Sequence, residues 1–270
     1  MLSFNRKEIF TLSEDNLEPL SITQLEPDLW QLQLWFVHAF LIHDDHDGWI
    51  LIDSGYPVKP GHPNMVVRAL DQLGLKTTDI TQILITHGHP DHIGNVALVA
   101  AQSHAPIWMG AADAGILEKS FPMPPVHQYD GSPGKGCPYF EPAPVTHRIH
   151  GDTQIPLAGS ITAIETPGHS AGQVAYLWNR HNGILFAADN LINENDELAI
   201  APGNIDFNQV RHSLEKLSYY EFDKLLVSHG NDLLANASFI YRNLWLPNLI
   251  PQTLNSVDSK NYQPQSANVS

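Results

Sequence analysis

Cysteine is almost absent from this sequence, which has one thiol, Cys137, in 270 residues. A single thiol can form no disulfide within the chain and no metal site built from several thiolates. Cys137 lies in the loop-forming stretch SPGKGCPYF, and none of the neighbouring residues is an obvious base. A cysteine nucleophile is therefore disfavoured, and other side chains are expected to supply the chemistry.

Positive charge is also scarce. Lys and Arg number 14 against 29 Asp and Glu, so the formal net charge is −15. The few basic residues are scattered, whereas nucleic-acid binding needs clustered positive charge. We therefore expect no nucleic-acid partner. A small-molecule substrate and a possible homo-oligomeric state are separate expectations.

Long apolar runs are missing as well. No stretch approaches the roughly 18 apolar residues of a membrane-spanning helix. The first residues, MLSFNRKEIF, lack the long apolar segment of a signal peptide. These absences predict a cytoplasmic protein with no membrane partner. With 43% hydrophobic and 16% charged residues, the composition is that of a globular protein with a sizeable core.

Strand and helix patterns alternate along both halves of the chain. Helices are predicted over residues 64–75, 92–103 and 207–220. Strands are predicted over residues 28–36, 37–44, 48–55, 79–86, 147–157, 160–168, 173–179, 183–189 and 223–230. The sequence DDHDG predicts a hairpin turn between the second and third strands. Two strand-rich halves flanked by helices predict two sheets packed face to face, with the helices outside.

One domain is expected over residues 1–250, followed by a polar extension without periodicity over residues 251–270. Within the domain, residues 121–144 contain seven prolines and three glycines. Proline fixes φ and removes a backbone donor, so no helix or central strand is expected there. Long loops in compact domains are often functional. The segment is either a wall or lid beside a site, with its aromatic residues lining a pocket, or a surface loop that these aromatics anchor.

The stretch ITHGHPDHIGN concentrates three histidines and one aspartate within six positions. At the end of a strand, residues i and i+2 point the same way, so His87 and His89 can bind one ion. Asp91 and His92 follow a proline at the turn into the next helix, so they can face a second ion. A solvated polar loop is the alternative, but it does not explain why these side chains are grouped. The pattern H-x-H-x-D-H therefore predicts a metal site.

Three further candidate ligands each follow a predicted strand. They are His169 in TPGH, Asp189 in LFAAD and His229 in LVSHG. Each residue alone would be an ordinary loop residue, but zinc needs more ligands than one short motif supplies. Together with the first motif these residues complete two sites. Asp189 can bridge two ions because a carboxylate has two oxygens.

The order of these motifs, with ILIDSG upstream, resembles the metallo-β-lactamase superfamily over roughly residues 37–231. The resemblance implies an α+β fold, a four-layer αββα sandwich, with a dinuclear site at one edge. It also implies roles for individual residues: His87, His89 and His169 bind one ion; Asp91, His92 and His229 bind the other; Asp189 bridges them; and Asp53 accepts a hydrogen bond that orients a ligand imidazole.

Individual positions of this sequence differ from the patterns of some branches of the family, and these differences narrow the activity that the resemblance implies. His89 stands where the oxygen-reducing diiron branch has glutamate, and Asp189 is similar to the glyoxalase II and lactonase pattern, whereas true β-lactamases lack it. Ala188 replaces a glycine that is common in the family. Glutathione thioesterases of the family add a helical, basic C-terminal domain, but only about 40 residues follow His229 here. The resemblance therefore gives little support to glutathione-thioester specificity.

The resemblance implies a dinuclear hydrolase with two divalent metal ions, Zn²⁺ first and Fe or Mn as alternatives. A hydroxide held between two ions would attack an ester, thioester, lactone or related carbonyl carbon. Asp91 would add a catalytic role as proton shuttle, and no serine nucleophile is needed because the metal-held hydroxide would be the nucleophile. The alternatives left open are a mono-iron persulfide dioxygenase, a β-lactamase and a non-catalytic metal-binding module.

Overall fold

The computed structural model describes residues 21–57, 64–120, 140–194 and 196–248. The predicted C-terminal extension, the boundary at residue 250 and Cys137 lie outside these residues. Most of the proline-rich segment does too, including Phe121, Tyr129 and Tyr139. Of its aromatic residues Phe140 is described, and its ring is buried in the core beside the Lys119 ammonium group. For Phe140, anchoring to the body of the protein is therefore the observed arrangement.

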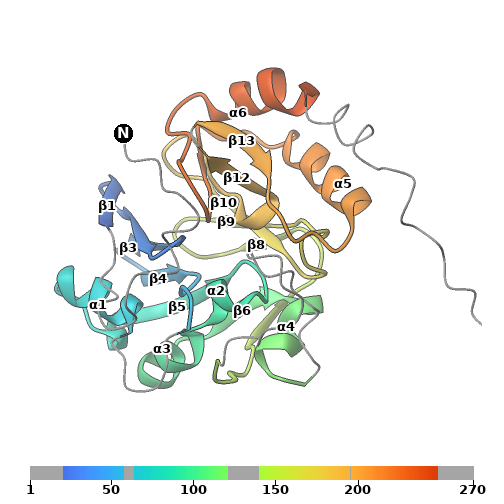
Figure 1. The fold of residues 1–270 in the computed structure, drawn as a ribbon. Coiled ribbons are helices and arrows are strands. Elements are labelled where there is room, and N and C mark those ends of the chain that lie inside the picture. The colour runs from blue at the N-terminus through green and yellow to red at the C-terminus, as the bar shows by residue number, and fades with distance from the viewer. Residues whose placement is uncertain (1–20, 58–63, 121–139, 195, 249–270) are drawn as a thin grey trace, which may run out of the picture.

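Two β-sheets occupy the centre of the molecule (Figure 1). The first contains β1 (Ser21–Glu26), β2 (Leu29–Leu34), β3 (Val37–Asp44), β4 (Gly48–Ile52), β5 (Ile80–Ile85), β6 (Ile107–Gly110) and β7 (His147–Ile149) in that order. The second has the order β14 (Lys224–Leu226), β11 (Ile184–Phe186), β10 (Val174–Trp178), β9 (Ile161–Glu165) and β8 (Thr153–Ile155). Strands β4 and β5 run parallel, and so do β11 and β14.

Helices cover the outer faces of both sheets. Helices α1 (Met65–Gln72) and α3 (Val96–Ser103) share a buried apolar cluster with the first sheet. Helix α5 (Phe207–Leu217) and the consecutive turns α6 (Ala237–Phe239) and η5 (Ile240–Trp245) share another with the second sheet. A third cluster joins the two sheets face to face. This arrangement confirms the predicted αββα sandwich, whose layers are visible in Figure 1.

The sandwich follows from the period of two along its strands. In β10, Val174, Tyr176 and Trp178 point into the cluster between the sheets. The intervening Ala175 and Leu177 point toward the outer helices. Alternate side chains of a strand face opposite sides of the sheet, so a strand that is apolar on both faces is buried on both. The same alternation in β3 and β4 places the first sheet in the middle of the molecule.

The predicted helices over residues 64–75 and 207–220 are observed as α1 and α5. Asn64 begins α1 by accepting hydrogen bonds from the backbone N–H groups of Val66 and Val67. Asp206 begins α5 in the same way. Side-chain oxygens at these positions satisfy N–H groups that have no partner within the helix. The predicted hairpin turn is also observed, because the Asp44 carboxylate accepts from two backbone N–H groups of the β3–β4 turn.

Other predicted boundaries were wrong. The single strand expected over residues 147–157 is two strands in different sheets, β7 and β8, separated by a turn at Gly151 with φ of +65°. The helix expected over residues 92–103 is divided into α2 (Pro90–Ile93) and α3 at Gly94. A Cβ atom at Gly94 would lie 2.2 Å from the Pro57 nitrogen, so only glycine fits this close approach, and the helical backbone is interrupted at the next residue, Asn95, with φ of −122°.

Several elements were not predicted by the sequence patterns. They are β1, β6, helix α4 (Ala111–Leu117), the hairpin of β12 (Leu191–Glu194) with β13 (Glu197–Ile200), and the turns α6 and η5. Two short 3₁₀ turns, η3 (Thr77–Asp79) and η4 (Ala188–Asn190), complete the described chain. Among the described residues, no helix is long and apolar enough to cross a membrane.

A hydrogen bond from Tyr176 connects the two sheets, and its contribution to stability can be predicted. Its fully buried hydroxyl donates a hydrogen bond of 2.8 Å to the carbonyl oxygen of Ile85, two residues before His87. We expect Tyr176→Phe to lose about 1 kcal/mol of unfolding free energy, a typical hydrogen-bond contribution. For a domain of this size that lowers the melting temperature by about 2–4 °C. Tyr219→Phe, at a side chain 83% exposed, is the control and should melt like the wild type; equal melting of both variants would contradict the prediction.

Candidate metal centre

All seven predicted ligands meet at one edge of the sandwich. Strand β5 ends at Ile85 and leads directly to the H-x-H-x-D-H motif, while Asp189 lies in η4 just after β11. His229 follows β14, which is parallel to β11, and His169 lies in the loop between β9 and β10. Loops that follow parallel neighbouring strands share an edge of the sheet, and ligands gather there for that reason.

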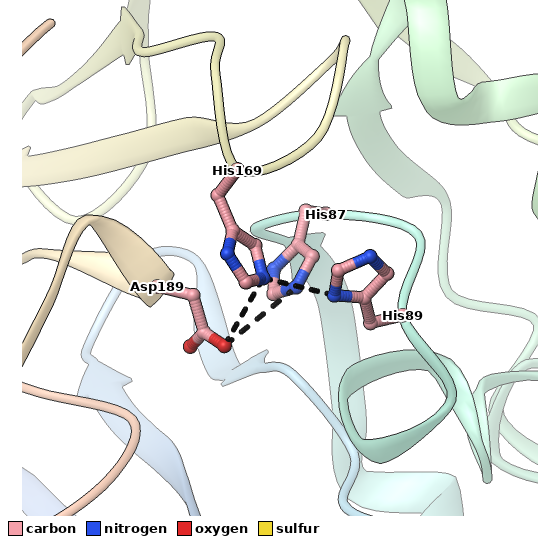
Figure 2. A group of neighbouring side chains, drawn as sticks. All are labelled: His87, His89, His169 and Asp189. Atoms are coloured by element: carbon pink, nitrogen blue, oxygen red, sulfur yellow. Dashed lines mark hydrogen bonds and ion pairs between the residues drawn. The ribbon is translucent and has the colours of Figure 1, made fainter. Parts of the chain in front are cut away.

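The first ligand group consists of His87, His89, His169 and Asp189, whose donor atoms all lie within 4.8 Å of one another. Figure 2 shows the four side chains pointing toward one another from three separate segments. Nε2 of His169 lies 2.9 Å from Nδ1 of His89 and 3.3 Å from the Asp189 carboxylate. Donors that bind one zinc ion at about 2 Å in tetrahedral geometry lie roughly 3–3.5 Å apart. The spacing of this group therefore suits a single ion.

The second ligand group consists of Asp91, His92 and His229, whose donor atoms also lie within 4.8 Å of one another. Nε2 of His229 is 3.4 Å from the Asp91 carboxylate, and Nε2 of His92 is 3.7 Å from it. The group combines two imidazole nitrogens with one carboxylate oxygen, which is a donor set that zinc and similar divalent ions accept.

Asp189 lies between the two ligand groups. Its Oδ2 atom is 4.0 Å from Nε2 of His87 in the first group and 3.4 Å from Nε2 of His229 in the second. Its Oδ1 atom is 3.5 Å from Nε2 of His92, also in the second group. One buried carboxylate thus faces donor atoms of both groups at once.

Several polar atoms of the cluster are buried without a hydrogen-bond partner. Nε2 of His87, Nε2 of His92, Oδ1 of Asp189 and Oδ2 of Asp91 all have this property among the described residues. An unsatisfied buried polar atom costs free energy, so native proteins seldom keep several together. Nitrogen and carboxylate oxygen atoms that converge in this way fit a divalent metal ion, which would supply the missing partner to each.

The pKa values of the first group suit metal binding. Burial lowers the pKa of His87 well below its usual value, and neighbouring imidazoles add to the effect. Burial also lowers the pKa of His89 to about 3, and that of His169 falls for the same first reason. Neutral imidazole is the form that binds metal ions, so these histidines need not lose a proton to do so.

The pKa values in the second group differ because two carboxylates, Asp91 and Asp189, face its histidines. Burial favours the neutral form of His229, but Asp189 and Asp91 outweigh it and raise its pKa to about 10. Burial disfavours the Asp91 anion, but His92 and His229 outweigh this and lower its pKa to about 2. The local field thus favours positive charge between these side chains, and a divalent cation provides that charge when it displaces the protons.

Asp53 lies behind the second group, directly after β4. Its Oδ2 atom accepts a hydrogen bond of 2.8 Å from Nδ1 of His92 and one of 2.7 Å from the Thr86 hydroxyl. Its Oδ1 atom accepts from the Thr86 backbone N–H. A proton held on Nδ1 leaves Nε2 of His92 as the atom that faces the cluster. On the other side, the Phe36 carbonyl oxygen lies 2.9 Å from Nδ1 of His229 and fixes that ring similarly.

The residue before Asp189 is Ala188, at the position where the family resemblance leads us to expect glycine. Ala188 has φ of +53°, in the left-handed region that favours glycine. The predicted strand over residues 183–189 was therefore wrong at its end, since β11 stops at Phe186 and the chain turns through η4. The turn directs the Asp189 carboxylate into the cluster. Ala188 adopts the strained backbone conformation that this turn requires.

One buried carboxylate near the cluster was missed from the sequence. Asp113 is 1% exposed and lies in α4, an element that the apolar pattern did not predict. It accepts hydrogen bonds from the backbone N–H of Gly88 and the hydroxyl of Ser170, which belong to the two loops carrying the first-group histidines. The signal in the sequence is a single charge within the small and apolar stretch MGAADAGIL.

Comparison with known proteins agrees with this geometry. The sequence model of the metallo-beta-lactamase superfamily matches residues 32–229. The probable metallo-hydrolase YflN of Bacillus subtilis is 24% identical over 219 residues, which cover 74% of this chain and 81% of that protein. A hydroxyacylglutathione hydrolase of Albidiferax ferrireducens is 31% identical over 157 residues, covering 57% of this chain and 47% of the relative. This chain thus matches about half the length of that hydrolase.

Solved structures share the fold across most of the chain. The MIM-2 metallo-beta-lactamase superimposes with a TM-score of 0.69 at 20% identity, covering 94% of this chain and 97% of that one. A beta-lactamase from Chitinophaga pinensis gives a TM-score of 0.61 at 25% identity, covering 81% of each chain. The family match extends over well more than half of the sequence and includes the whole ligand cluster. The chain therefore belongs to the metallo-β-lactamase superfamily.

Proposed function

We propose that this protein is a dinuclear hydrolase that cleaves an ester, thioester or lactone bond in a small molecule. The position of Asp189 carries the proposal, because its carboxylate faces donor atoms of both ligand groups. A carboxylate in that position can bridge two ions. The two groups supply nitrogen and oxygen donors, so Zn²⁺ is the first choice, with Fe and Mn as alternatives.

In this proposal each residue keeps the role that the family resemblance implies. The first group holds one ion and the second group the other. When bound, such a pair of ions polarises a carbonyl oxygen and makes water a nucleophile at neutral pH. The chain itself orients the ligand rings through Asp53 and the Phe36 carbonyl oxygen, and it keeps the cluster largely buried.

Asp91 is the proposed proton carrier. Its carboxylate is a candidate ligand, and the Oδ2 atom lies 3.4 Å from Nε2 of His229 at the edge of the cluster. It would accept a proton from the attacking water and return it to the leaving alkoxide or thiolate. The carbonyl carbon gains a bond to the water oxygen and loses its bond to the leaving oxygen or sulfur, so the step needs no oxidant.

Thioesters belong among the proposed substrates because several relatives carry the name hydroxyacylglutathione hydrolase. However, this chain aligns with only about half the length of two of these relatives. Two described basic residues are also engaged away from the cluster, since Arg148 pairs with Glu118 and Lys216 pairs with Asp152. We therefore propose a substrate whose recognition does not depend on the charges of glutathione. The cytoplasmic location and the homo-oligomeric state stay predictions.

The metal content tests the proposal directly. Protein purified without chelator should contain about two transition-metal ions per chain, because seven donors form two groups. The same sample should hydrolyse members of a panel of lactones, thioesters, aryl esters and β-lactams, and lose this activity when a chelator removes the metal. One iron per chain with oxygen consumption on a persulfide would support the dioxygenase alternative instead. Hydrolysis of β-lactams alone would assign the protein to the β-lactamases.

Replacing Asp189 tests the bridge. Asp189→Ala should lower kcat/KM by more than about 100-fold, beyond the usual cost of losing an outer-shell partner. Bound metal should also fall below two ions per chain, because both groups lose a facing oxygen. Asp71→Ala, at an exposed carboxylate of α1, is the matched control and should leave both quantities unchanged. Two tightly bound ions and a wild-type rate in Asp189→Ala would refute the bridging role.

Replacing Asp53 tests the support of the second group. In Asp53→Asn the side chain keeps its size but loses one acceptor, so the hydrogen bonds to His92 and Thr86 cannot all persist. We expect metal affinity to weaken by about 10–100-fold, the usual effect of losing an outer-shell partner. Competition with a chromogenic chelator measures this affinity, with Asp71→Asn as control. An affinity equal to that of the wild type would remove Asp53 from the site.

A further inference from the structure

Asp113 accepts three hydrogen bonds from the loops that carry the first ligand group. Its Oδ2 atom accepts from the backbone N–H of Gly88 at 2.9 Å and from the Ser170 hydroxyl at 2.6 Å. Its Oδ1 atom accepts from the backbone N–H of Gly172 at 2.7 Å. Hydrogen bonds to a carboxylate are stronger than those between neutral groups. Both oxygens of this buried side chain are therefore engaged.

Two of these partners are adjacent to candidate metal ligands in the sequence. Gly88 separates His87 from His89, and Ser170 follows His169. The first loop continues from β5 of the first sheet, while the second connects β9 and β10 of the second sheet. A single carboxylate thus connects, across the two sheets, the loops that supply all three histidines of the first group.

The packing around Asp113 leaves little room for these loops to move. A Cβ atom added to Gly172 would lie 2.4 Å from the Asp113 backbone nitrogen, and one added to Gly110 would lie 1.9 Å from the Gly172 carbonyl oxygen. A Cβ atom on Gly88 would approach Ile116 of α4 to 2.7 Å. Glycine at these positions lets both loops contact α4 and the residue before it directly. The loops are therefore held by close contact as well as by hydrogen bonds.

We propose that Asp113 is a positioning residue for the first ligand group. It fixes His87 and His89 relative to His169, as Asp53 orients His92 in the second group. The inference rests on the proposed metal binding at these residues, since Asp113 itself contacts none of the candidate donor atoms in the structure. Its effect should be confined to the ion that the three histidines hold.

Asp113→Asn is the informative substitution because it keeps the size of the side chain. A carboxylate accepts with both oxygens, whereas an amide presents one oxygen and one N–H₂ group. Whichever way the amide is turned, its N–H₂ group meets a donor, either Gly172 or Gly88 and Ser170. The loops must then separate by a small amount, and the first-group histidines lose their mutual position.

The experiment measures zinc affinity by competition with a chromogenic chelator, together with the melting temperature of the metal-free protein. In Asp113→Asn, one of the two ions should bind about 10–100-fold more weakly, the range for outer-shell partners, while the other is unchanged. A merely structural role would lower the melting temperature of the metal-free protein and leave both zinc affinities as in the wild type. That result would overturn the inference.

A double-mutant cycle assigns the effect to one ion. In a His169→Ala background the first group is already broken, so adding Asp113→Asn should change zinc affinity no further. In a His229→Ala background the second group is broken, and adding Asp113→Asn should still weaken the remaining ion. An equal effect in both backgrounds would overturn the inference. Should Asp113→Asn not fold, Ser170→Ala removes one of the three donors and should weaken the same ion by a smaller factor.

Failure of the proposed function gives a different pattern of results. A wild-type protein that binds two ions but hydrolyses no member of the substrate panel would refute the hydrolase proposal, while the affinities would still test Asp113. A wild-type protein that binds one ion would refute the dinuclear proposal. If Asp113→Asn then leaves the affinity for that ion unchanged, the inference about Asp113 fails as well.

Discussion

The cost of burying imidazole and carboxylate groups together is the constraint on which this structure depends. His87 and His92 are fully buried, and Asp189 is almost so, yet each has a polar atom without a hydrogen-bond partner among the described residues. Such a cluster destabilises a protein unless a cation satisfies it. The fold brings the groups together because several loops follow strands that end at the same edge, and it fixes them before any ion binds.

Fixing the cluster requires partners behind the ligands as well as the ligands themselves. Asp53 orients His92, and the Phe36 carbonyl oxygen lies against Nδ1 of His229. Asp113 connects the two loops of the first group across the sheets. Each partner is buried or is a backbone atom, so it loses little freedom when metal binds. A site organised in this way can spend its binding free energy on the ion and the substrate instead of on ordering loops.

The fold alone does not choose the substrate. Solved β-lactamases superimpose on most of the chain, while relatives in sequence carry the names hydroxyacylglutathione hydrolase and probable metallo-hydrolase. A shared fold hosts different activities through differences at the site. In this chain Asp189 stands between the two ligand groups, and the proposed function depends on it. Under that proposal, the walls around the cluster select the substrate.

Local patterns in the sequence were enough to place the candidate ligands after strands and to predict most strands of the two large sheets and helices α1, α3 and α5. H-x-H-x-D-H is a short motif at a strand end, and the alternation of apolar residues in β10 specifies burial on both faces; both signals lie within a few residues. The division of residues 147–157 between two sheets, the break at Gly94 and the role of Asp113 were decided by tertiary structure. Each depends on contacts between segments far apart in the chain, such as Gly94 against Pro57 and Asp113 against Gly172, and no local pattern encodes such distances.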